Sequence, residues 1–483
     1  MELQDPALLR TEAFIGGHWL AADDGARLAV SDPANGRLIG EVACCGAVET
    51  RHAIQAADAA LPGWRALSAH ARAAVLMRWH ALLLEHADDL ARLITAEGGK
   101  PLPEAQGEVR YGARFIEWFA EEGKRVYGDL IPSPEPDKRL LVMKQPIGVC
   151  AAITPWNFPL AMITRKAAPA LAAGCTLVVK PAEATPLTAL ALATLAERAG
   201  LPPGVFNVVT GEPAAIGREL CDNPVVRKLS FTGSTAVGRL LMARCAPTLK
   251  RLSLELGGNA PFIVFDDADL EAAVDGALAA KYRNAGQTCV CANRFIVQSG
   301  IHDAFVERLA EKVAALSVGP GMQAGTAVGP LISDAAVARV EAQLADALAR
   351  GATVLCGGER HALGGRFFQP TVLTGARPDM LCAREETFGP LAPVFRVDSE
   401  ADAIALANDS ESGLAGYFYT RDIGRAWRVA EALATGMVCL NTGLLSNEVA
   451  PFGGIKQSGF GREGSKYGMD DYLDIKYLCI GLG

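Results

Sequence analysis

Short apolar runs that alternate with helical patterns are the strongest constraint that this sequence places on its fold. The runs at 148–153, 175–179 and 205–209 are largely apolar, and the segment 186–199 between two of them repeats apolar residues at helical spacing. Parallel strands need a long crossover connection, most often a helix, and they are usually buried on both faces. The pattern therefore predicts β-α-β units and a parallel sheet in an α/β protein.

A second series of the same kind begins after Gly257-Gly258, where we place the boundary between two α/β domains. The expected elements of this series are strands at 262–265, 294–297, 353–355 and 392–395 and helices at 303–316 and 334–349. Ahead of both series, 49–98 is a helical region, with Ser68 as a helix N-cap and Gly98-Gly99 before Pro101 as a stop.

Two remaining stretches, 138–144 and 472–480, fit neither domain. Both are short and strand-like, with mixed apolar and polar residues. We expect them to pair as an exposed sheet whose edge a partner subunit covers.

Composition argues against several classes of function. Half of the 483 residues are hydrophobic, and 46 basic against 54 acidic residues give a net charge of −8 without long single-sign blocks. We therefore expect sizeable cores and no nucleic-acid partner. The first residues lack the charged and apolar regions of an export signal, and the apolar stretch 167–179 is short and contains Pro169 and Gly174, so we expect neither export nor a membrane span.

The use of cysteine and histidine points to a reducing compartment and no metal. Twelve cysteines are scattered through the chain, which favours reduced thiols in the cytoplasm over a disulfide framework. The seven histidines show no ligand spacing, and no pair of Cys-x-x-Cys elements occurs, so no metal site is expected.

One cysteine and one glutamate offer a nucleophile and a base. Cys289 lies in the small-residue loop 286–293, and Glu255 ends a strand-like run. A thiolate is the strongest nucleophile among ordinary side chains, so the pair indicates covalent chemistry on a carbonyl. Taken alone, Cys289 also fits a small buried side chain and Glu255 a solvated carboxylate.

A glycine turn that feeds a helix is the first sign of a phosphate-bearing ligand. Thr232-Gly233-Ser234 follow an apolar run and lead into a helix, where free backbone N–H groups can bind phosphate. The spacing to Gly238 departs from the Rossmann Gly-x-Gly-x-x-Gly pattern, so an ordinary strand-to-helix turn is the alternative.

Another predicted strand ends just before Lys180 and Glu183, and the ends of such strands are where ligands of open α/β sheets bind. A carboxylate at this place can accept hydrogen bonds from two ribose hydroxyls.

These motifs together resemble the aldehyde dehydrogenase superfamily, in order and spacing, from about residue 15 to the C-terminus. The matching segments are 154–159, 180–183, the glycine turn, Glu255, Cys289 and 385–390. Within the superfamily, the segments 162–166, 281–291, 446–454 and 461–468 are similar to those of succinate semialdehyde dehydrogenases.

The resemblance implies an α/β fold with a Rossmann-type cofactor domain, an α/β catalytic domain and a small β oligomerisation domain. It places the NAD(P)-binding domain at 1–127 and 147–256, the catalytic domain at 257–448, and the oligomerisation strands at 128–146 and 466–483. Residues 449–465 would return to the cofactor domain. The expected assembly is a homotetramer built as a dimer of dimers.

The resemblance also implies roles for the catalytic residues. Cys289 would be the nucleophile, with the Asn157 amide and the Cys289 backbone N–H as donors to the oxyanion. Glu255 would activate the water that hydrolyses the thioester.

The cofactor residues implied in the same way are Thr154, Pro155, Trp156, Lys180, Glu183, Thr232, Gly233, Ser234, Glu386 and Phe388. NAD is the expected cofactor, with NADP possible but weaker, because its 2′-phosphate would meet the Glu183 carboxylate.

The substrate residues implied by the resemblance are Arg165, Arg283 and Ser446. Succinate semialdehyde carries a carboxylate, and the planar fork of arginine can donate two parallel hydrogen bonds to it. Glutarate semialdehyde is one methylene longer, a difference worth only about 1–3 kcal/mol, so a glutarate semialdehyde dehydrogenase or a broader semialdehyde dehydrogenase is the alternative. A non-catalytic binding protein is the other alternative, but the catalytic residues are intact.

The resemblance to some of these enzymes further suggests that Cys289 and Cys291 form a reversible disulfide. A Cys-x-Cys bridge closes a very small ring, so the bond would be strained and easily reduced. The alternative is that Cys291 only fills a gap behind the loop.

Overall fold

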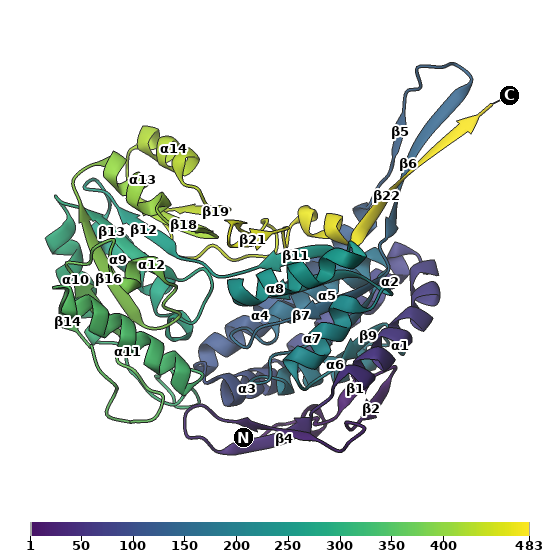
Figure 1. Cartoon of the computed structure of the whole chain (residues 1–483), viewed down its shortest axis with the longest axis horizontal. Helices are drawn as coiled ribbons and strands as arrows, with labels where there is room; N and C mark the ends of the chain where they lie inside the picture. Colours follow the sequence, from purple (N-terminus) through teal and green to yellow (C-terminus); the bar gives the residue numbers. More distant parts are fainter. Residues whose placement is uncertain (1, 483) are drawn as a thin grey trace.

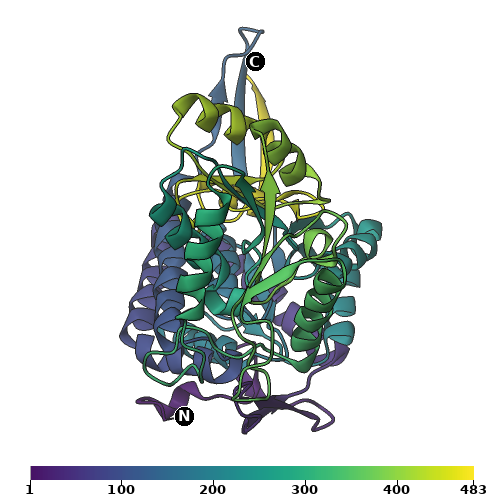
Figure 2. The same cartoon turned by 90° about the vertical axis from the view of Figure 1, so that its left-hand side faces the viewer.

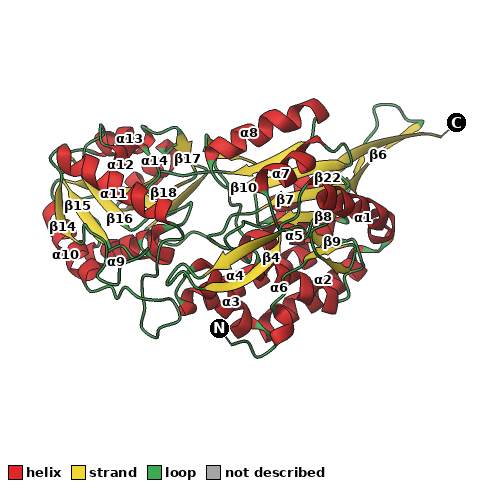
Figure 3. Ribbon diagram, turned by 60° about the horizontal axis from the view of Figure 1, so that its bottom comes forward, coloured by secondary structure: helices red, strands yellow, loops and turns green. Residues whose placement is uncertain are grey.

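Two β-sheets, each with helices packed against it, make up most of the chain in the computed structural model, which describes residues 2–482 (Figure 1). Figure 3 shows the two bodies side by side, with strands between helices in each. A third, smaller sheet projects from the body that carries the N-terminus (Figure 2).

The first sheet has eight strands in the order β2-β1-β9-β8-β7-β10-β11-β21. Their bounds are β1 Ala13–Ile15, β2 His18–Leu20, β7 Val149–Ile153, β8 Thr176–Lys180, β9 Phe206–Val208, β10 Val226–Thr232, β11 Arg251–Glu255 and β21 Gly459–Phe460. The five strands from β9 to β11 are parallel, and β1 and β21 pair antiparallel at the two sides. The strand order reverses between β7 and β10, and such a switch point is where open α/β sheets bind ligands.

Helices cover both faces of this sheet. They are α1 Ala47–Ala66, α2 Ala69–Glu85, α3 Ala87–Gly98, α4 Leu102–Glu122, α5 Ala161–Ala173, α6 Leu187–Arg198, α7 Pro213–Asp222 and α8 Thr235–Cys245. On one face a core around Trp79, Phe115 and Phe206 joins the sheet to α2, α4, α5 and α6. On the other face Ile216 of α7 and Leu241 of α8 pack against the strands.

The helical region predicted at 49–98 is three helices, and the predicted cap and stop are present. The Ser68 hydroxyl accepts a hydrogen bond from the Ala71 N–H at 3.2 Å at the start of α2. Gly99 ends α3 with a φ of +77°, a conformation that glycine adopts without strain. Nearby, β3 Arg27–Ser31 and β4 Leu38–Ala43 form a separate antiparallel pair that the sequence did not predict.

The second sheet has seven strands in the order β14-β15-β16-β13-β12-β18-β19, all parallel except the edge strand β14. The strands are β12 Ala260–Val264, β13 Ala292–Gln298, β14 Thr353–Cys356, β15 Thr371–Thr374, β16 Leu391–Val397, β18 Ala415–Tyr419 and β19 Met437–Leu440. Its helices are α9 Leu270–Lys281, α10 His302–Ala314, α11 Asp334–Ala349, α12 Leu381–Arg384, α13 Glu400–Asn408 and α14 Ile423–Ala432. The predicted helix 334–349 has the observed bounds of α11.

Smaller elements complete the described chain. The strands β17 Ser412–Gly413 and β20 Ile455–Lys456 pair with each other. The 3-10 helices are η1 Pro6–Leu8, η2 Gly123–Arg125, η3 Ala246–Thr248, η4 Arg283–Gly286 and η5 Lys466–Tyr472. Within residues 2–482, no helix combines the length and the apolar character needed to span a membrane.

The third sheet joins the two strand-like stretches that fitted neither domain. It contains β5 Asp129–Ile131, β6 Lys138–Pro146 and β22 Leu473–Gly481, and β22 pairs antiparallel with β6 along its whole length. The strand assignment at 466–483 needs one correction, because residues 466–472 form η5. There Met469 and Tyr472 are buried in the core that α4 and α5 share, so this turn belongs to the body of the protein.

Candidate active site

A cavity of about 250 Å³ lies where β7, β10 and β11 end, beside the switch point of the first sheet. Its walls come from both bodies of the protein. The sequence-predicted residues that line it are Pro155, Trp156, Asn157, Thr232, Gly233, Ser234, Glu255, Cys289, Glu386 and Phe388. The structure therefore brings the candidate nucleophile, the candidate base and most of the candidate cofactor residues together.

Cys289 also lines a second cavity of about 310 Å³, so it stands between the two spaces. It follows η4, where Asn284 and Ala285 have φ values of +51° and +56°. Residues other than glycine adopt this conformation at a cost of about 1–3 kcal/mol, which is typical of functional loops. The strained turn leads the chain from α9 into a half-buried position for the thiol.

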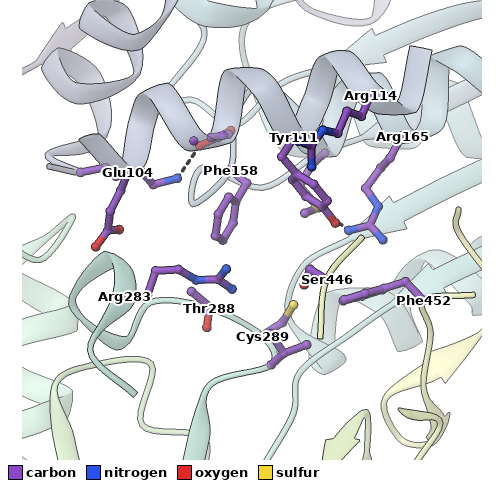
Figure 4. Close-up of a pocket in the computed structure, with 15 residues that line it drawn as sticks. Glu104, Tyr111, Arg114, Phe158, Arg165, Arg283, Thr288, Cys289, Ser446 and Phe452 are labelled. Atoms are coloured by element: carbon purple, nitrogen blue, oxygen red, sulfur yellow. Dashed lines mark hydrogen bonds and ion pairs between the residues drawn. The ribbon is translucent and has the colours of Figure 1, made fainter. Parts of the chain in front are cut away.

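The second cavity contains all three predicted carboxylate-binding residues. Arg165 from α5, Arg283 from η4 and Ser446 line it together with Cys289 (Figure 4). Figure 4 shows Arg283 and Ser446 near the thiol and Arg165 farther along the wall. The cavity therefore offers cationic donors to a ligand held at Cys289.

Arg165 is 1% exposed and is held by a buried carboxylate. Its Nε lies 2.7 Å from a Glu463 oxygen, and Lys166 contacts the other oxygen. Burial alone would raise the pKa of Glu463, but Lys166 and Arg165 outweigh it and lower this pKa. Among the described residues, Nη2 of Arg165 has no hydrogen-bond partner, so a buried donor remains for a ligand.

Arg283 is held by an aromatic ring instead of a carboxylate. Its guanidinium lies 5.6 Å from the centre of the Phe158 ring, and its Nε is another buried donor without a partner in residues 2–482. Two unsatisfied guanidinium donors in one cavity favour an anionic ligand there, because an unpaired buried donor is costly.

Glu255 is 3% exposed, and neither of its carboxyl oxygens accepts a hydrogen bond from any described residue. Burial raises the pKa of Glu255 well above its ordinary value, and repulsion from Glu463 raises it further. A carboxylate in this environment binds a proton more tightly than an exposed one, which suits a general base.

The Cys289 thiol is also held in its neutral form. Burial raises its pKa to about 12, and the nearby carboxyl groups of Glu386 and Glu255 contribute, while Arg165 and Arg283 act in the opposite sense. The resting side chain is therefore a thiol, and it needs a base or a new positive charge nearby to become a nucleophile.

Asn157 is fixed beside the loop of Cys289. Its side-chain Nδ2 donates to the backbone carbonyl of Gln287 at 3.0 Å. The backbone carbonyl of Asn157 accepts from Lys100 Nζ at 2.8 Å and from Asn284 Nδ2 at 3.2 Å. An amide nitrogen carries two N–H groups, so one remains for a ligand in the cavity.

The glycine turn fits a phosphate-bearing dinucleotide. A Cβ on Gly233 would lie 2.4 Å from the Phe231 ring, so only glycine lets the backbone take this path. The Ser234 hydroxyl caps α8 by accepting from the Val237 N–H at 3.4 Å. Because Ser234 also lines the cavity, the N-terminus of α8, with its free N–H groups, opens toward it.

Three more predicted residues of this cavity have features that suit a nicotinamide and its ribose. Glu386 accepts from the Gly258 N–H at 3.1 Å, and burial raises the pKa of Glu386 to about 7. Phe388 has a φ of +50°, and its ring meets Trp156 edge-on with the centroids 5.6 Å apart. The strained backbone at Phe388 is a second sign of a functional position.

We call the first cavity, of about 250 Å³, the cofactor cavity. Its lining does not include three of the predicted cofactor residues, Thr154, Lys180 and Glu183. Thr154 joins β8 through its N–H, which donates to the Lys180 carbonyl at 3.1 Å. Lys180 forms an ion pair with Glu183, and burial lowers the pKa of Lys180 to about 8. These residues extend the edge of the sheet on the side of β8, beyond the cavity itself.

Cys291 faces the core behind the loop. It is 4% exposed, and its thiol donates to the Lys281 carbonyl at 3.4 Å. Cys289 and Cys291 are both free thiols.

Sequence reasoning missed several residues of the second cavity, of about 310 Å³, which we call the carboxylate cavity. Tyr111 and Arg114 of α4 line it, and so does Phe452, whose ring lies 4.2 Å from the Arg165 guanidinium. Tyr111 and Arg114 are three positions apart on one helix face, a spacing that is also usual for surface residues. Glu463 was inside a matched segment, but nothing in its neighbourhood indicated its contact with Arg165.

Comparison with known proteins agrees with this geometry. The profile of the aldehyde dehydrogenase family matches residues 19–478. The chain belongs to the aldehyde dehydrogenase family. This aldehyde dehydrogenase is therefore an NAD(P)-dependent enzyme that oxidises aldehydes, and no group of three or more potential metal ligands occurs among its described residues.

Three relatives show how similar this aldehyde dehydrogenase is to known members. It is 64% identical to the succinate-semialdehyde dehydrogenase [NADP(+)] of Escherichia coli and 63% identical to the glutarate-semialdehyde dehydrogenase of Pseudomonas aeruginosa, in each case over 100% of both chains. The crystal structure of succinate-semialdehyde dehydrogenase from Burkholderia pseudomallei is 65% identical, with a TM-score of 0.99 over 100% of both chains. The aldehyde dehydrogenase fold expected from the sequence is confirmed.

The raised pKa of Cys289 predicts how the cofactor-free enzyme reacts with iodoacetamide. Only the thiolate reacts, and its fraction should rise about tenfold for each pH unit from pH 7 to pH 10, because a group with a pKa of about 12 is still mostly protonated there. The measurement is the alkylation rate at Cys289 by peptide mass spectrometry, with Cys289→Ala as the control. A plateau below pH 9 would show that the thiol has an ordinary or lowered pKa.

Proposed function

We propose that this aldehyde dehydrogenase oxidises succinate semialdehyde to succinate, with glutarate semialdehyde as the alternative substrate. The observation that carries the proposal is the cavity of about 310 Å³ in which Arg165, Arg283 and Ser446 surround the approach to Cys289. A neutral aldehyde would leave the unpartnered buried donors of Arg165 and Arg283 without an acceptor. The names of the E. coli and P. aeruginosa relatives support both substrates.

In the proposed reaction, ionised Glu255 takes the thiol proton of Cys289 and passes it on to solvent, and the sulfur attacks the aldehyde carbon. The free N–H of the Asn157 amide and the backbone N–H of Cys289 donate to the oxygen that becomes negative, and such donors are worth about 3–4 kcal/mol each. NAD(P) bound in the cofactor cavity would supply a hydride acceptor, and loss of the hydride would leave a thioester on Cys289. Glu255 then takes a proton from the water that hydrolyses the thioester, and its unpartnered oxygens are free for this.

The buried environment of Glu255 supports its proposed role as a base. Its carboxyl group and the Cys289 thiol both line the cofactor cavity, and burial disfavours the charged form of each. Only the ionised form of Glu255 can accept a proton from the thiol or from water, and a raised pKa makes that carboxylate a stronger base.

For the cofactor, we propose that NAD is preferred over NADP. Glu183 stands at the end of β8, where its carboxylate would accept hydrogen bonds from ribose hydroxyls. A 2′-phosphate would meet that carboxylate at a cost of up to about 4 kcal/mol for one charge pair at 4 Å in a dielectric of about 20. Solvent lowers this ceiling, because the Glu183 side chain is 39% exposed.

The substitution Glu183→Ser should increase kcat/KM with NADP relative to NAD. It removes the negative charge and releases Lys180, its ion-pair partner, to meet a 2′-phosphate. The measurement is kcat/KM with each cofactor at saturating aldehyde. Since the E. coli relative is named as an NADP enzyme, the wild-type comparison is decisive, and a higher kcat/KM with NADP than with NAD would refute the preference.

The test of the substrate assignment is Arg283→Ala. We expect KM for succinate semialdehyde to rise about tenfold or more, with little change for butanal, because a hydrogen bond between charged groups is lost only with the carboxylated substrate. Arg165→Ala is a less specific test of substrate binding, because it also removes an ion-pair partner of Glu463.

The matched control is Arg110→Ala, on the exposed side of α4 and outside the lining of the cavity. It removes the same charge from the same neighbourhood. Equal losses with succinate semialdehyde and butanal in Arg283→Ala would show that Arg283 supports the structure instead of binding substrate.

We further propose a homotetramer, a dimer of dimers, in which the third sheet lies at an interface. Its edge strand β22 exposes Ile475 at 72% and Tyr477 at 58%, and Leu130 on β5 is 71% exposed. An exposed apolar edge strand invites pairing with another chain unless it is covered.

The double substitution Ile475→Glu with Tyr477→Glu should lower the molar mass measured by light scattering from that of a tetramer to that of a smaller species. The control is Lys476→Glu, which changes the net charge equally and lies between the two residues, on the opposite face of the strand. A wild-type mass below that of a tetramer, or an unchanged mass in the double variant, would contradict the proposal.

We also retain as a proposal the reversible disulfide between Cys289 and Cys291. Hydrogen peroxide would oxidise the Cys289 thiol to a sulfenic acid with loss of water, and the Cys291 thiol would displace a second water to form the bond. Cys291 would first have to leave the Lys281 carbonyl. After peroxide, dithiothreitol should restore activity in the wild type but not in Cys291→Ala, and equal irreversible loss in both would leave Cys291 a packing residue.

A cytoplasmic location completes the proposal. All twelve cysteines are free thiols, which suits a reducing compartment. Recovery of the native enzyme in an exported fraction by cell fractionation would contradict it.

A further inference from the structure

Helix α4 supplies a row of residues to the carboxylate cavity. Glu104, Gly107, Glu108, Tyr111 and Arg114 all line it, at spacings of three or four positions that place them on one helix face. Arg114 is the last of the row, about 4.5 Å beyond Tyr111 along the helix axis. The helix therefore presents different side chains at different depths of the same cavity.

The two carboxylates of this row already have partners. Glu108 forms an ion pair with Lys100 and accepts from the Leu160 N–H at 2.9 Å. Glu104 accepts from the Asn284 N–H at 2.8 Å. Neither group is arranged to neutralise a cation at the far end of the row.

Arg114 is different, because none of the described residues forms a hydrogen bond or an ion pair with its side chain. Figure 4 accordingly draws no dashed line to Arg114. An exposed arginine is commonly only a solvated side chain on a helix surface. Arg114, however, lines the cavity whose other walls hold Arg165 and Arg283. Its five N–H donors are free for solvent or for a ligand.

The charges of the cavity wall exceed what one substrate carboxylate needs. Four cationic residues line it, Lys100, Arg114, Arg165 and Arg283, against the two carboxylates Glu104 and Glu108. Glu463, the carboxylate that Arg165 contacts outside the lining, is shared with Lys166. Guanidinium groups that share a cavity repel one another until an anion enters. The position of that anion depends on the length of the molecule that carries it.

We propose that Arg114 is a specificity-determining residue that binds the carboxylate of semialdehydes longer than four carbons. The aldehyde carbon must lie at Cys289, so each added methylene moves the carboxylate farther from the thiol. Figure 4 shows Arg114 beyond the Tyr111 ring as seen from Cys289, while Arg283 and Ser446 are close to the thiol. This inference rests on the proposed oxidation of carboxylated aldehydes.

The experiment compares kcat/KM for the semialdehydes of butanedioic, pentanedioic and hexanedioic acid in the wild type and in Arg114→Gln. We expect the values for the five- and six-carbon substrates to fall about tenfold, because a charge-assisted hydrogen bond is lost. The four-carbon value should stay within about twofold of the wild type. Arg114→Lys, which keeps the charge but not the planar fork, should recover part of the loss.

Arg110→Gln is the matched control, because it removes the same charge one helix turn away and outside the cavity. An equal fall for all three substrates that disappears at high salt would show long-range steering and overturn the inference. Unchanged ratios between chain lengths would also overturn it. The proposed function fails separately, if the wild type oxidises no carboxylated aldehyde faster than a neutral one.

Discussion

The buried carboxylate of Glu463 is the interaction on which both cavities depend. It contacts Arg165 and Lys166, two consecutive residues of α5, from a segment near the C-terminus. Arg165 continues into the carboxylate cavity, and Lys166 Nζ donates to the Thr232 hydroxyl at 2.6 Å beside the cofactor cavity. One anion therefore fixes a side chain of each cavity, and without it two cations would be buried unpaired, which is strongly destabilising.

Cys289 lies at the junction of the two bodies of the protein and lines both cavities. It comes from the body of the second sheet, whereas Glu255 is the last residue of β11 and Asn157 follows β7, both in the first sheet. The candidate catalytic groups therefore meet only when the two bodies are docked. The strained turn at Asn284 and Ala285 and the strained Phe388 lie on this junction, where packing from both sides can hold an unfavourable backbone.

The sequence predicted the parts of this architecture that depend on local pattern. The strands at 148–153 and 175–179, the helix at 334–349 and the cap at Ser68 follow from periodicity and turn chemistry. The roles considered for Cys289 and Arg165 came from matched motifs. Local pattern could not show the contact of Glu463 with Arg165 or the two-residue strand β21, because each depends on a partner far away in the chain. Tyr111 and Arg114 were missed because their spacing suits any exposed helix face.

The antiparallel strand β21 has a consequence for the order in which the protein is made. It completes the first sheet by pairing Gly459 with Glu255, although the rest of that sheet is synthesised before the whole of the second body. During translation, domains tend to fold as soon as they leave the ribosome. Here one edge of β11 stays unpaired while the second body is synthesised, so a chain interrupted before β21 would expose an unpaired strand that ends at Glu255.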